Sequence, residues 1–496
     1  MADVFDAVLM VDPAREALVT RSGHWSYADF DALADRAAHA LRDLGVARGD
    51  RVAAALPNDI DVIAVFHGAM RLGAVWVGVN RILAAPEKRY VLEDCDAALL
   101  VCDPPTAEQL GDVRGVRLVV TGGEGGDEWR DAVARASAEP VPRDVDPHAP
   151  AGIAYTSGTT GFPKGALHSQ HNLLVPGAAL VWSRGYDARL RKGDFLALTI
   201  LNMQVLTTLL TAQAGGCAVV MDRNDAVGVA EWIRRERVTT WNGPPALIHS
   251  LATDDRVRAA DLETLDEVWN GGSDCPEPLR AAFAAKFGLP VLGTYGLTEA
   301  PTVVSIDDRD GTHVPGASGR PLPHLSVRAV DGELCVGGVD DGPWAGVYRL
   351  MLGYWRRPEP TAETLRDGVL HTGDLGHVDD EGNVFIRDRK SLVILRGGGN
   401  VYPAEVERVV HELPAVAACA VVGIPDERLG ERVGAVVELA PGATISDEEL
   451  TAHCAANLAR YKVPERWVFV GEMPRNAMGK IKRPELVVLF SFPQVP

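Results

Sequence analysis

The sequence is poor in cysteine and in positive charge, and each shortage argues against a class of protein. Its 496 residues include seven cysteines, an odd number, and no two of them form a CxxC pair. Such scatter argues against a disulfide framework and favours a reducing compartment. Lysine and arginine number 49 against 68 acidic residues, a formal net charge of −19. We therefore expect no nucleic acid partner, although a local basic pocket for a small phosphate is compatible with this charge.

Targeting segments and repeats are also lacking. No basic segment precedes an apolar core at the N-terminus, so no secretory signal is expected. Residues 195–221 carry no charge and could span a bilayer by length. Polar side chains that would need partners in hydrocarbon interrupt this stretch: Asn202, Gln204, Thr207, Thr208, Thr211 and Gln213. We predict a strand, a loop and a buried helix there, no membrane span, and a cytoplasmic enzyme.

The remaining composition, 47% hydrophobic with 50 glycines and 32 prolines, is typical of a globular protein with two or more cores. Helical periodicity alternates with short apolar runs at residues 52–56, 98–102 and 117–120. Such runs between helices predict buried, largely parallel strands in an α/β domain. Ser26 and Asp29 resemble a capping box at the start of a helix that Gly45 closes. A helix over 277–287, stopped by Gly288, leads into an apolar run at 289–292.

The last hundred residues have a different character. Pro403 occupies the first position of a predicted helix, and Ser446 with Glu449 opens another. Strands are expected at 416–422, 432–439 and 468–470. This pattern indicates a compact α+β domain. A basic patch runs into three glycines near residues 389–399, so we predict an N-terminal domain over 1–388, a hinge at 389–392 and a mobile C-terminal domain over 393–496.

The segment over residues 155–165 carries the strongest chemical signal. Small hydroxyl residues alternate with glycines, and one lysine, Lys164, ends the group. Glycines let backbone N–H groups approach an anion, hydroxyls donate hydrogen bonds, and lysine adds charge, so the combination suits a polyphosphate. It is not a P-loop, because Gly165 stands where the magnesium-binding Ser or Thr would follow the lysine.

This segment resembles the signature loop of the adenylate-forming superfamily, which includes acyl-CoA synthetases, luciferases and peptide-synthetase adenylation domains. Further motifs of the superfamily follow in order at residues 293–299, 353–355, 371–375, 397–405 and 474–480, and cover nearly the whole chain. The sequence is most similar to acyl-CoA ligases. The resemblance implies a large α/β domain with mostly parallel sheets, and a small mobile α+β domain that carries a catalytic lysine.

The resemblance also implies roles for single residues. The loop would hold the β- and γ-phosphates of ATP, Tyr295 would lie against adenine, and Asp374 with Arg389 would bind the ribose. The residues implied at the nucleotide are Thr156, Ser157, Gly158, Thr159, Thr160, Gly161, Gly272, Ser273, Thr294, Tyr295, Asp374 and Arg389. The residues implied in catalysis are Lys164, Thr298 at the α-phosphate, Glu299 as the Mg²⁺ ligand, and Lys480 between the acyl carboxylate and the α-phosphate.

Two further sites follow from the resemblance. The residues expected to line the acyl pocket are Asn202, Trp241, Asn242, Gly271, Thr294 and Leu297. Trp241 and Leu297 favour a bulky or apolar acid and Asn202 suits a polar substituent, while a core position is also open for Trp241. The tunnel for coenzyme A is expected at Gly397, Gly398 and Gly399.

The function implied is an ATP-dependent carboxylate–CoA ligase that uses Mg²⁺, forms an acyl-AMP and transfers the acyl group to coenzyme A. Its partners would be a small carboxylic acid, ATP and coenzyme A; a homodimer is left open. The sequence departs from the superfamily pattern at Asp388, Ser391 and Gly399. It also departs at Leu201 and Asn202, which replace an aromatic–histidine pair. These departures leave open an enzyme that catalyses only one of the two half-reactions. The pattern also leaves room for an enzyme that loads a carrier protein, and for a non-catalytic nucleotide-binding protein.

Overall fold

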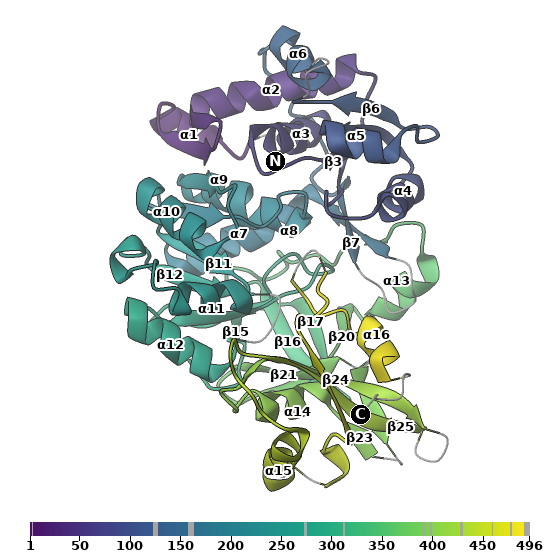
Figure 1. Ribbon diagram of the computed structural model, residues 1–496. Helices are drawn as coiled ribbons and strands as arrows, with labels where there is room; N and C mark the ends of the chain where they lie inside the picture. The colour runs from purple at the N-terminus through teal and green to yellow at the C-terminus, as the bar shows by residue number, and fades with distance from the viewer. Residues whose placement is uncertain are drawn as a thin grey trace.

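The computed structural model describes residues 1, 3–122, 127–156, 163–271, 275–310, 313–389, 392–396, 399–426, 430–458, 460–476 and 479–490. Its strands form four sheets (Figure 1). Two large, mostly parallel sheets build the N-terminal part, a smaller antiparallel sheet follows, and a fourth sheet belongs to the C-terminal part. This arrangement confirms the predicted large α/β domain followed by a small α+β domain.

The first large sheet has the strand order β18-β8-β7-β4-β3-β5-β6. Strands β7, β4, β3, β5 and β6 are parallel, whereas β8 and β18 are antiparallel to their neighbours. Its strands are β3 (Arg51–Ala55), β4 (Val75–Gly78), β5 (Ala97–Cys102), β6 (Arg117–Val120), β7 (Pro150–Thr156), β8 (Lys164–Ser169) and β18 (Gly353–Tyr354). The apolar runs predicted as buried parallel strands correspond to β3, β5 and β6.

The second sheet has the order β15-β14-β13-β12-β11-β9-β10-β1-β2, with β13 through β1 in that order parallel. Its strands are β1 (Glu16–Thr20), β2 (Gly23–Ser26), β9 (Arg191–Asp194), β10 (Cys217–Val220), β11 (Thr240–Gly243), β12 (Glu267–Asn270), β13 (Val291–Tyr295), β14 (Ser305–Ile306) and β15 (Arg320–Pro321). The carboxyl ends of its parallel strands lie at one edge, where ligands bind in such sheets.

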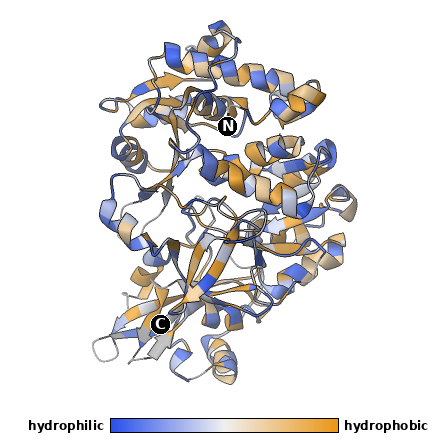
Figure 2. Ribbon diagram, turned by 180° about the vertical axis from the view of Figure 1, so that it is seen from behind, coloured by the Kyte–Doolittle hydropathy of each residue, from blue (hydrophilic) through white to orange (hydrophobic). Residues whose placement is uncertain are grey.

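Helices cover and separate these two sheets (Figure 1). The helices of this part are α1 (Asp6–Val11), α2 (Tyr27–Asp43), α3 (Ile60–Leu72), α4 (Ala85–Asp94), α5 (Pro104–Leu110), α6 (Glu128–Arg135), α7 (Gln170–Arg184), α10 (Ala226–Glu236), α11 (Pro245–Thr253) and α12 (Glu277–Phe287). Outer helices alternate between blue and orange in Figure 2, as amphipathic helices do. The caps follow the predicted local signals: Ser26 and Asp29 form a capping box, and Gly288 ends α12 in the left-handed conformation.

The charge-free stretch forms one continuous buried helix between the two sheets. It consists of α8 (Leu201–Gln204), a π-helical turn η1 (Val205–Leu209) and α9 (Leu210–Ala214), and leads into β10. The predicted buried helix is confirmed, but the strand follows it instead of preceding it. Hydroxyl groups are satisfied locally, since Thr211 Oγ1 donates to the Thr207 carbonyl at 2.7 Å. No helix within the described ranges is long and apolar enough to cross a membrane.

The third and fourth sheets complete the chain. The third comprises β16 (Leu325–Val330), β17 (Glu333–Gly338), β19 (Leu365–Arg366), β20 (Val369–Val378) and β21 (Val384–Arg389), with α13 (Pro358–Thr364) beside it. The fourth comprises β22 (Ile394–Arg396), β23 (Gly399–Val401), β24 (Val416–Asp426), β25 (Gly430–Leu439) and β26 (Arg466–Val470), with α14 (Pro403–Val410), α15 (Asp447–Asn457) and α16 (Arg483–Val487). Pro403 begins α14 and Ser446 caps α15, as predicted.

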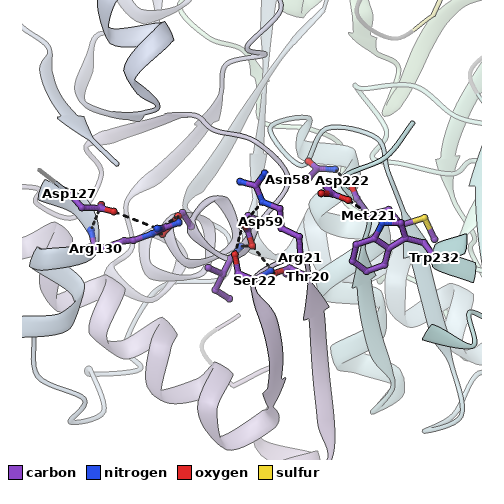
Figure 3. A network of polar contacts seen from close by, with 12 residues as sticks. Thr20, Arg21, Ser22, Asn58, Asp59, Asp127, Arg130, Met221, Asp222 and Trp232 are labelled. Carbon is purple, nitrogen blue, oxygen red and sulfur yellow. Dashed lines mark hydrogen bonds and ion pairs between the residues drawn. The ribbon is translucent and has the colours of Figure 1, made fainter. Parts of the chain in front are cut away.

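Two consecutive residues before α3 join the two large sheets (Figure 3). Asn58 Nδ2 donates to the carbonyls of Phe195 and Leu196 at 3.0 and 2.9 Å, and its Oδ1 accepts from the Leu198 amide at 2.9 Å. Asp59, which caps α3, accepts from Thr20 and Ser22 of the β1–β2 hairpin at 2.6 Å each. The loop that leads into α8 is thus held from the first sheet.

We predict that Asn58→Ala lowers the free energy of unfolding by about 2 kcal/mol or more, because it leaves backbone groups of the 195–198 loop without partners. Urea unfolding followed by tryptophan fluorescence measures the change. The control is Asn457→Ala, which removes one exposed hydrogen bond to the His453 carbonyl and should change stability by no more than about 0.5 kcal/mol. Equal effects of the two substitutions would contradict the proposed joining role of Asn58.

Candidate active site

The predicted phosphate loop connects two antiparallel strands of the first sheet. Thr156 ends β7 and Lys164 begins β8, and the two residues are paired in register. Thr156 Oγ1 donates to the Lys164 carbonyl at 3.4 Å. Five predicted loop residues lie outside the described residues: Ser157, Gly158, Thr159, Thr160 and Gly161. The described residues on either side, Thr156 and Lys164, are neighbours on adjacent antiparallel strands.

Tyr354 connects Lys164 with Glu299, two residues that are far apart in the sequence. Strand β18 pairs with β8, which brings Tyr354 opposite Ala166. The Lys164 Nζ lies 5.4 Å from the centre of the Tyr354 ring, and the Tyr354 hydroxyl donates to Glu299 Oε1 at 2.7 Å. The 353–355 motif contributed to the resemblance, but no role was predicted for Tyr354. Its position in that motif was the one feature of the sequence that could have identified Tyr354 as a site residue.

The segment after β13 folds back tightly and presents Thr298 and Glu299. A Cβ atom on Gly296 would lie 1.8 Å from the Thr302 carbonyl oxygen, so only glycine fits there. His168 on β8 donates from Nε2 to the Thr298 carbonyl at 2.9 Å, which ties this segment to the first sheet. Burial lowers the pKa of His168 to about 4, so the ring is neutral near pH 7. No motif in the sequence pointed to His168.

A hydrogen bond joins the residues predicted to hold adenine and ribose. The Tyr295 hydroxyl at the end of β13 donates to Asp374 Oδ2 on β20 at 2.6 Å, and both side chains are buried. The backbones of Asp374 and Arg389 are paired in register between β20 and β21. Two residues that are predicted at one ribose are thus neighbours. The predicted adenine-edge residues Gly272 and Ser273 lie outside the described residues.

Most described residues expected at the acyl pocket come from the carboxyl edge of the second sheet. Thr294 Oγ1 donates to the Asn270 carbonyl at 2.8 Å, and a Cβ on Gly271 would lie 2.9 Å from that hydroxyl. Leu297 is buried. Asn202 of α8 is half-buried, and its Oδ1 accepts no hydrogen bond from a described residue.

The structure places Trp241 differently from this expectation. Trp241 and Asn242 are successive residues of β11, so their side chains point to opposite faces of the sheet. Trp241 is fully buried in the apolar core with residues of α10 and α11, and its ring lies over Gly243. Asn242 faces η1 instead, where it accepts a hydrogen bond from Lys192. Trp241 is therefore a core residue and does not line the pocket.

Lys480 lies in an exposed turn of the C-terminal part. Its backbone N–H donates to Asn476 Oδ1 at 3.0 Å, and its carbonyl accepts from the Asn476 amide at 2.8 Å. Figure 1 draws the segment that precedes α16 in yellow, extending from the fourth sheet toward the middle of the molecule. The predicted hinge residues Lys390 and Ser391, and Gly397 and Gly398 of the expected tunnel, lie outside the described residues; Gly399 begins β23.

The described residues therefore gather a lysine, a carboxylate and hydroxyl donors where three sheets meet. A cation and donors placed in this way can stabilise negative charge on phosphate oxygens. A single carboxylate such as Glu299 suits Mg²⁺, which keeps water and phosphate ligands and needs only one or two carboxylates. Within the described ranges, no group of three or more His, Cys, Asp or Glu residues forms a metal cluster.

Comparison with known proteins identifies the family. The model of the "AMP-binding enzyme" family matches residues 5–355, and the model of the "AMP-binding enzyme C-terminal domain" matches residues 405–480. The chain belongs to the AMP-binding enzyme family. These two matches together include Lys164, Thr298, Glu299 and Lys480.

Relatives within the AMP-binding enzyme family differ in the acids named for them. The chain is 34% identical over 483 residues to the long-chain-fatty-acid–CoA ligase FadD13 of Mycobacterium tuberculosis, covering 95% of this chain and 94% of that protein. It is 34% identical to the indoleacetate–CoA ligase of Aromatoleum aromaticum (96% and 95% covered). It is 36% identical to the fatty acid–[acyl-carrier-protein] ligase ScoC of Streptomyces coeruleorubidus (96% and 93%).

Two crystal structures of the same protein, with and without ATP, differ in how well they superpose on this chain. ATP-bound MatB from Rhodopseudomonas palustris superposes with a TM-score of 0.91, at 30% identity and with 99% of each chain covered. The apo form of the same protein gives 0.80 at the same identity and coverage. The overall arrangement of the AMP-binding enzyme described here is therefore closer to the ATP-bound form.

The buried neutral form of His168 predicts how stability depends on pH. The pKa of His168 is about 4 in the folded protein and about 6.5 in the unfolded chain, so the unfolded state binds the proton first. Stability from the neutral ring is present above pH 6.5 and is lost as the pH falls toward 4, by about 3 kcal/mol. His168→Gln should flatten urea-unfolding stability between pH 6.5 and 4, whereas exposed His249→Gln should not. Parallel pH profiles for His168→Gln and wild type would contradict this.

Proposed function

We propose that this AMP-binding enzyme is an ATP-dependent carboxylate–CoA ligase. The observation that carries the proposal is the arrangement of Lys164, Tyr354 and Glu299 beside the Tyr295–Asp374 pair. In this proposal, Lys164 and Glu299 would serve the phosphates, and the Tyr295–Asp374 pair would serve the nucleoside. The CoA ligases among the relatives support the same class of reaction.

In the first step, a carboxylate oxygen of the acid attacks the α-phosphorus of ATP. The bond from that phosphorus to the bridging oxygen breaks, and pyrophosphate leaves with the electron pair. Two anions approach each other in this step, so cationic groups and donors must offset the developing charge. We assign Lys164 to the outer phosphates, Thr298 to the α-phosphate and Lys480 to the acyl carboxylate. Glu299 would hold Mg²⁺, which supplies charge neutralisation at the phosphates when bound.

In the second step, the thiolate of coenzyme A attacks the acyl carbon. The bond from that carbon to the phosphate oxygen breaks, and AMP leaves. We propose that the C-terminal part, residues 393–496, rotates about 389–392 between the steps, withdrawing Lys480 and bringing the 397–399 glycines to the thiol. A few hinge residues that absorb a backbone change are the usual device for such a motion.

Two assays test the function. Exchange of labelled pyrophosphate into ATP should require a carboxylic acid and no coenzyme A, and adding coenzyme A should release AMP and acyl-CoA in equal amounts. Persistent formation of ADP would contradict the proposal. Comparing supplied acyl-AMP plus coenzyme A with free acid plus ATP plus coenzyme A identifies an enzyme of one half-reaction, because only one starting point would then be turned over.

Lys480→Ala tests the division of labour between the two steps. Adenylate formation should fall by a factor of about 10² or more, the scale of losing one charge contact to the transition state, while thioester formation from supplied acyl-AMP is retained. The matched control is Lys482→Ala, two residues away and half-exposed in an ion pair with Glu485, which should leave both rates within about two-fold. Equal losses in both steps for Lys480→Ala would contradict the alternation.

A further inference from the structure

Tyr354 contacts both the lysine and the carboxylate that the candidate site receives from two different sheets. Lys164 Nζ lies over its ring, 5.4 Å from the ring centre, and its hydroxyl donates to Glu299 Oε1 at 2.7 Å. All three side chains are half-buried. A tyrosine suits this place, because its ring face attracts a cation and its hydroxyl donates to an anion.

Strand pairing places the lysine beside the tyrosine. Tyr354 of β18 is paired in register with Ala166 of β8, and Lys164 is two residues before Ala166 on the same strand. Residues i and i+2 of a strand share one face of the sheet, so Lys164 and Tyr354 are diagonal neighbours on adjacent strands. The register of the first sheet therefore determines this contact.

The backbone on both sides of Tyr354 is fixed by hydrogen bonds. The Tyr354 amide donates to Thr361 Oγ1 at 2.8 Å, and the Trp355 amide donates to the Gly165 carbonyl at 2.7 Å. The φ angle of Gly353 is +119°, and a Cβ there would lie 2.7 Å from the Thr361 side chain, so glycine is required at this position. A side chain that projects from such a backbone can position its neighbours accurately.

The contacts of Tyr354 keep two opposite charges apart. Its ring contacts Lys164 and its hydroxyl contacts Glu299, and the structure, which describes both of these residues, shows no ion pair between them. Such an ion pair would occupy the lysine and the carboxylate before a nucleotide arrives. A ligand that must first open the pair binds more weakly, in proportion to the fraction of molecules in which the pair is open.

The hydroxyl of Tyr354 also orients the Glu299 carboxylate. A glutamate side chain loses rotamer freedom when it is held in one position, and the bond from Tyr354 imposes this loss during folding instead of during ligand binding. Carboxylates that bind metal ions are usually held by such outer hydrogen bonds, and removing the outer partner typically lowers metal affinity about 10–100-fold.

We propose that Tyr354 is a positioning residue for ATP and Mg²⁺. Its ring holds Lys164 apart from Glu299, and its hydroxyl orients the Glu299 carboxylate, so the site has a separate cation and anion ready before the nucleotide binds. The inference rests on the roles of Lys164 and Glu299 in the proposed function and adds the residue that keeps these two groups ready. It concerns the nucleotide alone, so it can be tested without knowing the acid.

Tyr354→Phe tests the hydroxyl, because this variant keeps the ring. Calorimetry in EDTA should give an ATP affinity within about two-fold of wild type, because the cation–π contact remains. The Mg²⁺ concentration that gives half of the metal-dependent gain in ATP affinity should rise at least about 10-fold. The matched control is Tyr348→Phe, whose buried hydroxyl forms no hydrogen bond with a described residue and which should behave as wild type. An unchanged Mg²⁺ dependence of Tyr354→Phe would overturn the role of the hydroxyl.

Tyr354→Leu tests the ring. In EDTA its ATP affinity should be at least about five-fold lower than that of Tyr354→Phe, because Lys164 loses the cation–π contact and can pair with Glu299. Glu299→Gln removes this competing anion, so it should raise the metal-free ATP affinity of Tyr354→Leu at least about three-fold more than it raises that of wild type. Equal affinities of the Phe and Leu variants, or equal effects of Glu299→Gln in the two backgrounds, would overturn the separating role of the ring.

Two further readouts keep the test valid. Circular dichroism checks the folding of each variant, and Tyr354→Phe, which removes a single oxygen atom, still tests the inference if Tyr354→Leu does not fold. Thioester formation from supplied acyl-AMP uses no ATP, so Tyr354→Phe should retain it; a loss equal to that in adenylate formation would mean that Tyr354 acts only on stability. Absence of pyrophosphate release with every acid would contradict the ligase function, whereas nucleotide binding that ignores Tyr354 would contradict only the inference.

Discussion

The site depends on the constraint that three separate sheets end at one place. Lys164 comes from the first sheet, Tyr295 ends the last parallel strand of the second and Glu299 follows it, and Asp374 lies on the third. Side chains join these sheets: Tyr295 bonds to Asp374, Tyr354 bonds to Glu299, and His168 bonds to the Thr298 carbonyl. Each of these bonds is made by a residue beside or within the candidate catalytic set. The hydrogen bonds that hold the sheets together therefore also position the candidate catalytic residues.

The interior between the two large sheets has two distinct sides. Toward the first sheet, the central helix presents apolar side chains such as Leu201. Toward the second sheet its Thr207 bonds to Asp194, which pairs with Lys192, and Glu267 with Arg184 forms a second buried ion pair of that sheet. Charges this deeply buried persist only when they are paired and hydrogen-bonded. Lys192, Asp194 and Thr207 therefore hold one another in place in this layer.

Local signals in the sequence predicted local structure well. The Ser26 capping box, Gly288 after α12 and Pro403 at the start of α14 were each identified because a few adjacent residues determine a helix end. The candidate site was reached through motifs, which name residues but not their contacts. Tyr354 and His168 were not identified from the sequence, because they contact residues that are 55 and 130 positions away in the chain. The resemblance named both Trp241 and Asn242 at the pocket and left a core position open for Trp241, but adjacent residues of a strand face opposite sides of a sheet.

The sequence by itself determined the family, the class of chemistry and the position of most helices and strands, because motif order, apolar periodicity and helix caps depend on residues close together in the chain. Only the tertiary structure decided which face of β11 turns Trp241 into the core, that Lys192 and Asp194 form a buried pair, and that Tyr295 bonds to Asp374. These facts depend on how sheets and helices pack across long sequence separations. Strand register and helix rotation decide them, and neither is encoded in any short segment.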